Sequence, residues 1–142
     1  MPDQNDVNKK FKQLQNCLAK NDEKGVHDAI SYLGGTENDW TTIPDEIVER
    51  LLTLLRSEEM YKSPLAACVL NLFEFESSRL TDGAKWLCIG FLNAHGDKFL
   101  DVRSRHVVTE LRSGHYKDYL KMKKPSPRQW EDYQKMKDDV EP

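Results

Sequence analysis

The four histidines are the first side chains to consider for acid–base chemistry, because imidazole titrates near neutral pH. They are His27, His95, His106 and His115. His95 lies within the segment Asn93–Asp97, where a loop could present it as a general base. The same segment also fits the end of a helix, where a histidine is favourable and a glycine commonly follows. We favour this second interpretation for His95.

Metal, redox and nucleophilic chemistry are poorly supported by the remaining reactive residues. Cys17, Cys68 and Cys88 are widely spaced among apolar residues, which predicts reduced core thiols and not a zinc knuckle or a redox pair. The histidines form only fragments of metal-ligating motifs. The sequence has no glycine-rich phosphate loop, no Gly-x-Ser-x-Gly elbow and no zincin histidine pair. We therefore expect no catalytic residues, no metal and no cofactor.

A group of acidic residues around one tryptophan is the best candidate for a binding surface. Trp40 lies in the otherwise polar segment 36–42, and seven acids against two arginines fall between Glu37 and Glu59. An aromatic anchor suits an interface, and acidic charge would steer a basic partner. The alternatives are a solvated helix face and a Trp40 that folds back onto the following helix. The residues predicted to bind a partner are Glu37, Asp39, Trp40, Asp45, Glu46 and Glu49.

The opposite charge gathers toward the C-terminus, where a nucleic-acid surface would have to lie. Basic residues and aromatics alternate over 117–130, a pattern that suits single strands. The whole chain nevertheless has a net charge of −3, so we expect no direct nucleic-acid binding. The longest apolar run, Trp86 to Leu92, is too short to span a membrane, and the first residues lack a secretory signal. We expect a cytoplasmic protein that does not bind membranes.

Helices must position all of these residues, because apolar side chains recur at helical spacing and none alternate as in a strand. The first helix is expected over 7–20. The residues predicted to open later helices are, in chain order, Asn21-Asp22, Pro44, Ser63-Pro64, Ser77-Ser78 or Thr81, Asp97 and Ser126-Pro127. The glycines predicted to end helices are Gly34, Gly96 and Gly114. A short helix is expected around Tyr116, Tyr119 and Leu120, and the last helix carries Trp130, Tyr133 and Met136.

Three of these helices share one apolar register. Leu33, Leu72 and Leu111 lie 39 residues apart, and the same offset aligns two further sets: Ala29, Cys68 and Val107, and Ile30, Val69 and Val108. A pair of helices that repeats at roughly forty residues is typical of an α-solenoid. Each pair would bury its apolar face against the next pair.

This pattern resembles HEAT and armadillo repeats over residues 7–114. Asp101 and Arg103 resemble the Asp and Arg that link neighbouring HEAT repeats, although the first two units lack such a pair. The resemblance implies an all-α, right-handed stack of about three antiparallel helical hairpins. We expect one domain over 1–142, with repeats at 7–114, C-terminal capping helices at 115–137 and a frayed tail at 138–142. A helical bundle without repeats is the alternative.

In size, acidity and fold style the chain resembles small immunity proteins of bacterial toxin systems, such as contact-dependent growth inhibition. That resemblance implies a protein that binds a cognate toxin, often a basic nuclease domain, and covers its active site. The first alternative is a HEAT-like adaptor that binds a protein or peptide through Asp28, Ser31, Asn71, Glu74, Arg103 and Glu110. The second is a helical-repeat protein that binds nucleic acid through Lys121, Lys123 and Lys124.

Overall fold

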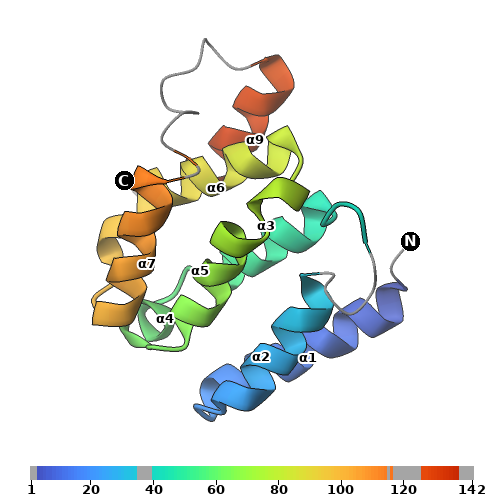
Figure 1. Cartoon of the computed structure of the whole chain (residues 1–142), viewed down its shortest axis with the longest axis vertical. Coiled ribbons are helices and arrows are strands. Elements are labelled where there is room, and N and C mark those ends of the chain that lie inside the picture. The colour runs from blue at the N-terminus through green and yellow to red at the C-terminus, as the bar shows by residue number, and fades with distance from the viewer. Residues whose placement is uncertain (1–2, 35–39, 115, 117–125, 138–142) are drawn as a thin grey trace.

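The computed structural model describes residues 3–34, 40–114, 116 and 126–137, and every regular element in these ranges is helical (Figure 1). The predicted all-α class is confirmed. The α-helices are α1 (Gln4–Ala19), α2 (Glu23–Leu33), α3 (Asp45–Leu54), α4 (Glu58–Lys62), α5 (Ala66–Phe75), α6 (Asp82–His95), α7 (Val102–Ser113) and α9 (Pro127–Lys137). Two 3-10 turns, Ser77–Arg79 and Gly96–Lys98, flank α6. The predicted helix around Tyr119 and Leu120 and the predicted tail lie outside the described residues.

Three predicted caps hold helix N-termini as expected. The Asp22 carboxylate accepts from the Gly25 amide at 3.1 Å, and the Thr81 hydroxyl accepts from the Ala84 amide at 3.1 Å. The Ser126 hydroxyl accepts from the Gln129 amide at 3.2 Å, while the Gln129 side chain accepts from the Ser126 amide at 2.9 Å. These reciprocal bonds form a capping box. Short polar side chains satisfy the otherwise unbonded amides of the first turn.

Asp97 was predicted to cap the helix that follows α6, and this prediction is wrong. The cap of α7 is Asp101, whose carboxylate accepts from the Ser104 amide at 3.1 Å. A 3-10 turn and the fully buried Phe99 separate the two helices, so the new helix starts later. The Asp97 carboxylate instead accepts from Arg112 Nη1 at 2.7 Å, which lowers the pKa of this exposed carboxyl.

Other helix boundaries differ by a few residues. Asp3 caps α1, so this helix begins before Val7, and Pro44 lies just before α3 and not within it. Pro64 lies in a turn before α5, which begins at Ala66. The short α4 was not expected, and its cap is the Ser57 hydroxyl, which accepts from the Met60 amide at 3.2 Å.

The apolar register predicted for α2, α5 and α7 lies in the core. All nine residues of the 39-residue alignment are at most 7% exposed. α2 contacts α5, and α5 in turn contacts α7, so equivalent positions lie along consecutive helix interfaces (Figure 1). Burial of these aliphatic side chains stabilises the fold by removing apolar surface from water.

The remaining helices pack around this set. α1 packs on α2, α3 packs on α6, and α9 covers α6 (Figure 1). The α9 backbone approaches Gly90 so closely that a Cβ atom there would lie 2.5 Å from the Tyr133 carbonyl oxygen. Met136 is buried in this contact, Tyr133 is half-buried and Trp130 remains 47% exposed. Only a glycine allows α6 and α9 to pack at this distance.

Candidate partner-binding surface

The tryptophan of the predicted binding group packs against α2. Trp40 is half-buried, and its ring meets that of Tyr32 edge-to-face with centroids 5.9 Å apart. The Arg79 guanidinium donates to the Trp40 carbonyl, which ties the segment before α3 to the turn before α6. Glu37 and Asp39 lie outside the described residues. Trp40 therefore presents only part of its ring to a partner.

The three described acids of the predicted group each contact a different helix or helix cap. Asp45 Oδ1 accepts from the Thr81 hydroxyl at 2.6 Å, and Glu46 Oε1 accepts from Gln4 Nε2 at 2.6 Å. Glu49 Oε2 lies 3.7 Å from Lys135 Nζ. The carboxylates thus link α3 to α1, to the start of α6 and to α9. They do not converge on a single cluster.

Asp3, the cap of α1, and Asp6 in its first turn add to the acidic charge near Trp40, although neither belongs to the predicted group. Asp3 and Asp6 are exposed in and before the first turn of α1. Burial and the charges of Asp6 and Asp3 raise the pKa of Tyr32, the partner of Trp40. The exposed Glu46 hydrogen-bonds to the same end of α1. The N-terminal ends of α1 and α3 therefore form one acidic end of the molecule.

Asp132 of α9 is a further acid that the sequence did not single out. Its side chain is 13% exposed and lies 3.8 Å from Lys135 Nζ. A Cβ atom on Gly83 would lie 2.4 Å from Asp132 Oδ2 and 3.4 Å from Asp45 Oδ2, so both carboxylates cover the start of α6. Burial and the charge of Asp45 raise the pKa of Asp132, although Lys135 acts in the opposite direction.

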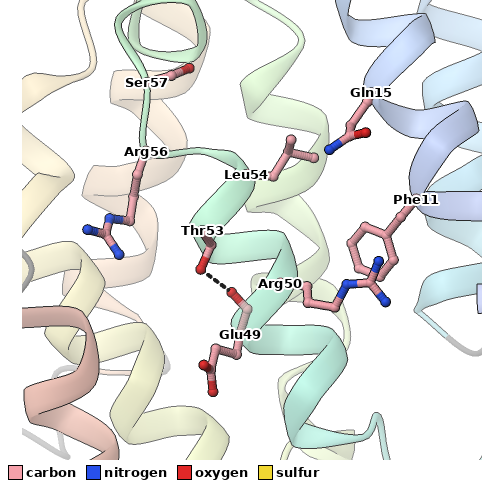
Figure 2. A pocket seen from close by; sticks show the side chains of 8 residues that line it. All are labelled: Phe11, Gln15, Glu49, Arg50, Thr53, Leu54, Arg56 and Ser57. Atoms are coloured by element: carbon pink, nitrogen blue, oxygen red, sulfur yellow. Dashed lines mark hydrogen bonds between the residues drawn. The ribbon is translucent and has the colours of Figure 1, made fainter. Parts of the chain in front are cut away.

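An open groove of about 520 Å³ runs between α1 and α3, beyond the contacts that join their N-terminal ends (Figure 2). Arg50 closes one end, because its Nη1 donates to Asn8 Oδ1 at 2.9 Å and its guanidinium lies 3.9 Å from the centre of the Phe11 ring. Figure 2 shows Leu54 and Gln15 facing each other across the groove. The residues that line it are Phe11, Gln15, Glu49, Arg50, Thr53, Leu54, Arg56 and Ser57.

Comparisons of the chain with protein families, with curated proteins and with solved structures found no match. No helix in the described part of the chain is long and apolar enough to cross a membrane. The groove between α1 and α3 is one candidate surface for a partner.

The second surface is a groove of about 430 Å³ between α5 and α7. Val102 is one of the residues that line it, and 79% of its surface is exposed. Asn71 and Arg103, two of the residues expected to matter in an adaptor, line this groove. The complete lining consists of Ala67, Asn71, Val102, Arg103, His106 and Val107.

His95, the candidate general base, lies in the core at the end of α6. It is 3% exposed, its Nδ1 is 3.1 Å from the Tyr61 hydroxyl, and its ring packs on Phe91 with centroids 5.2 Å apart. The interpretation of the segment as a helix C-terminus is confirmed for His95, the last residue of α6, with Gly96 following. A buried ring at this place does not face either groove.

The structure also brings together three side chains of types that can bind a metal: a carboxylate, an imidazole and a thiol. Glu23 and His27 lie one turn apart on α2, and Cys68 lies on α5. His27 Nε2 is 3.6 Å from Glu23 Oε2 and 3.7 Å from Cys68 Sγ. The four-residue spacing of Glu23 and His27 was visible in the sequence. The 39-residue register, which aligns Cys68 with Ala29 of α2, was a second sequence feature that could have placed Cys68 near these two residues.

Proposed function

We propose that this protein is an inhibitor of the immunity-protein kind, which neutralises a cognate bacterial toxin by binding it and covering its active site. The groove between α1 and α3, together with the acidic end formed by Asp3, Asp6 and Glu46, is the proposed contact surface. The observation that carries the proposal is the open groove, since it combines apolar atoms of Leu54 with charged walls beside this acidic end.

The shape of the groove favours a protein partner over a small molecule. Small-molecule sites are enclosed and bury most of the ligand, whereas this groove is an open channel between two helices. Its lining includes the charged side chains of Glu49, Arg50 and Arg56, of which Arg50 points toward Phe11 (Figure 2). A mixed polar rim around a small apolar centre is typical of a protein interface, and a helix or loop of a partner would fit it.

The charge at the end of the groove supports a basic partner. Asp3, Asp6 and Glu46 are exposed, and opposite charge speeds association by steering. A nuclease needs a positive cleft for phosphates, so an acidic inhibitor could mimic its substrate. The proposal keeps Glu46 of the predicted group, because its side chain is exposed although it accepts a hydrogen bond from Gln4. It adds Asp3 and Asp6 and leaves Asp45 out, because Asp45 is partly buried at its contact with the Thr81 hydroxyl.

We further propose that the helices form a short HEAT-like stack, with α9 as its C-terminal cap. The support is the buried 39-residue register of α2, α5 and α7 and the consecutive contacts between these helices. The position of α9 against α6 also supports it. Such an architecture would give an extended surface of α1 and α3 on one side and of α5 and α7 on the other.

The test starts from the gene that directly precedes this one, since an immunity gene follows its toxin gene. The C-terminal domain of that neighbour is co-expressed with this protein, and cell survival and the affinity of the purified complex are measured. We expect a one-to-one complex and full protection. Leu54→Asp should weaken binding at least about tenfold, the effect of losing a central contact. Glu46→Lys should slow association, most of all at low salt.

Glu110→Lys on α7 is the matched control, because it reverses an exposed charge far from the groove along the chain. It should leave affinity within about twofold. If Leu54→Asp and Glu46→Lys both leave binding and protection unchanged, the surface assignment is wrong. If the neighbouring protein is not toxic and does not bind, the immunity function is wrong.

One observation favours the adaptor as a second candidate. Val102, with 79% exposure, is an unusually exposed aliphatic residue beside the groove between α5 and α7. In an adaptor, Val102→Asp and not Leu54→Asp would abolish capture of the partner. The nucleic-acid alternative stays a prediction, because Lys121, Lys123 and Lys124 lie outside the described residues.

A further inference from the structure

We propose that Glu23, His27 and Cys68 form a binding site for a divalent metal ion of the zinc class, which joins α2 to α5. The three donor atoms all lie within 4.8 Å of one another. This site goes beyond the proposed inhibitor function and does not depend on it.

Two of the three distances between donor atoms match those that one tetrahedral ion would require. Zinc bonds of about 2.0–2.3 Å to N, O and S place neighbouring donor atoms about 3.4–3.6 Å apart. His27 Nε2 is 3.6 Å from Glu23 Oε2 and 3.7 Å from Cys68 Sγ. The Glu23 carboxylate and Cys68 Sγ lie within 4.8 Å of each other, and rotation of the exposed Glu23 side chain can bring them to the separation that one ion requires.

The donor set selects the class of metal. A thiolate, an imidazole and a carboxylate together suit Zn²⁺ or Co²⁺, whereas Mg²⁺ and Ca²⁺ prefer oxygen alone. His27 and Glu23 have side chains 57% and 51% exposed, while Cys68 is 6% exposed. The ion would sit at the surface with its sulfur ligand beneath it. Water would occupy the fourth position, as in open zinc sites.

Arg103 of α7 supports the carboxylate from outside. Its Nη1 lies 3.7 Å from Glu23 Oε1, the oxygen opposite the one that faces His27. Glu23 can therefore keep this contact while Oε2 binds the metal. Partners of this kind orient the ligands of metal sites.

Metal binding must compete with a proton on the cysteine. Burial and the charge of Glu23 raise the pKa of the Cys68 thiol, with Arg103 acting in the opposite direction. The metal binds the thiolate, so one proton leaves as the metal–sulfur bond forms.

The test uses the full-length reduced protein and Co²⁺ as a spectroscopic probe, followed by displacement with Zn²⁺. A thiolate ligand produces an intense sulfur-to-cobalt charge-transfer band. We expect one such band per chain, which Zn²⁺ abolishes at one equivalent. Zn²⁺ should also raise the thermal unfolding midpoint, because it binds the folded chain at residues of two helices.

Cys68→Ser should abolish the charge-transfer band, and His27→Gln should weaken Zn²⁺ binding at least about tenfold. His27 is exposed, so its replacement tests the site without disturbing the core. Two matched controls should bind like the natural protein. Cys17→Ser removes the partly exposed cysteine of α1, and His106→Gln removes a histidine with a similar i,i+4 acid neighbour, Glu110, on α7.

The absence of a charge-transfer band in the natural protein would overturn the proposal. A band that persists in Cys68→Ser but disappears in Cys17→Ser would also overturn it. Failure of either kind would leave the inhibitor proposal intact, since toxin binding is measured without added metal.

Discussion

Two sets of helix contacts in this protein are built from different chemistry. α2, α5 and α7 meet through aliphatic side chains at equivalent positions of one register. α3 is additionally linked to its neighbours by acidic side chains, through Asp45, Glu46 and Glu49. Burial of a leucine stabilises a fold by about 1.5–3 kcal/mol, and an exposed ion pair by about 0–1 kcal/mol. Charges that look like a binding patch in the sequence can thus serve as weak links between helices.

The largest effect on stability is expected for Leu72→Ala in α5, which tests the contribution of the apolar register. Leu72 is 6% exposed, and its Cδ1 lies against Gly34 at the end of α2. We expect the free energy of unfolding to fall by about 2–5 kcal/mol, because apolar burial is lost and a cavity remains. Unfolding in denaturant measures this loss of free energy. Asn71→Ala, outside the register, should cost less than about 1 kcal/mol. Equal losses for the two variants would show that the register is not the main source of stability.

A second test addresses the contact between α6 and α9. Gly90→Ala places a methyl group against the Tyr133 backbone, which cannot move without shifting α9. We expect a loss of about 1–3 kcal/mol, as for overpacked cores, and faster amide hydrogen exchange over 127–137. In Gly83→Ala the new methyl group meets the Asp132 side chain, which can rotate away, so the loss should be smaller. A larger loss for Gly83→Ala would contradict the close backbone contact.

The third test uses pH to examine Asp132. Its pKa is raised above the ordinary 3.8, so the folded state holds the proton more tightly than the unfolded chain. The stability that follows is fully present below the ordinary pKa and is lost as the pH rises through the raised value. The free energy of unfolding of Asp132→Asn should therefore increase relative to that of the natural protein as the pH rises from about 3 to 7. Urea unfolding at several pH values measures this difference. Glu59→Gln, at an exposed acid of α4, is the control. If Asp132→Asn instead became more stable relative to the natural protein as the pH falls, the raised pKa of Asp132 would be contradicted.

The smallest effect is expected at the ion pair between α3 and α9. Glu49 and Lys135 have side chains 44% and 54% exposed and an N···O distance of 3.7 Å. A double-mutant cycle with Glu49→Gln and Lys135→Gln should give a coupling of about 0.2–1 kcal/mol, reduced by salt. A coupling above about 2 kcal/mol would mean that the polar links rival the apolar register.

Local features of the fold were predictable from residue types and spacing. The caps Asp22, Thr81 and Ser126 were recognised because their hydrogen bonds reach amides only three residues away. The prediction failed at Asp97, although Asp97 and Asp101 are both suitable caps. The choice between them depended on the 3-10 turn and on the burial of Phe99, which is decided by the neighbouring helices.

The candidate surfaces were less predictable. Trp40 and its acids were selected from their proximity in the chain, yet their partners lie on α1, α2, α6 and α9 or at the caps of these helices. Asp132 was not selected, because it becomes buried only when α9 covers α6. A charged side chain reaches several ångströms, so the sequence cannot show which neighbour it meets.

The sequence by itself determined the helical class, three of the N-terminal helix caps and the apolar register of α2, α5 and α7. These features follow from hydrogen bonds within a few residues and from the 3.6-residue period of the helix. Tertiary structure decided what the polar side chains do. Glu23 and His27 share a helix face in any case, but Cys68 is 41 residues from His27 and reaches it only because α5 packs against α2. Which side chains meet across a helix interface depends on how the helices pack, and this geometry is not local in the chain.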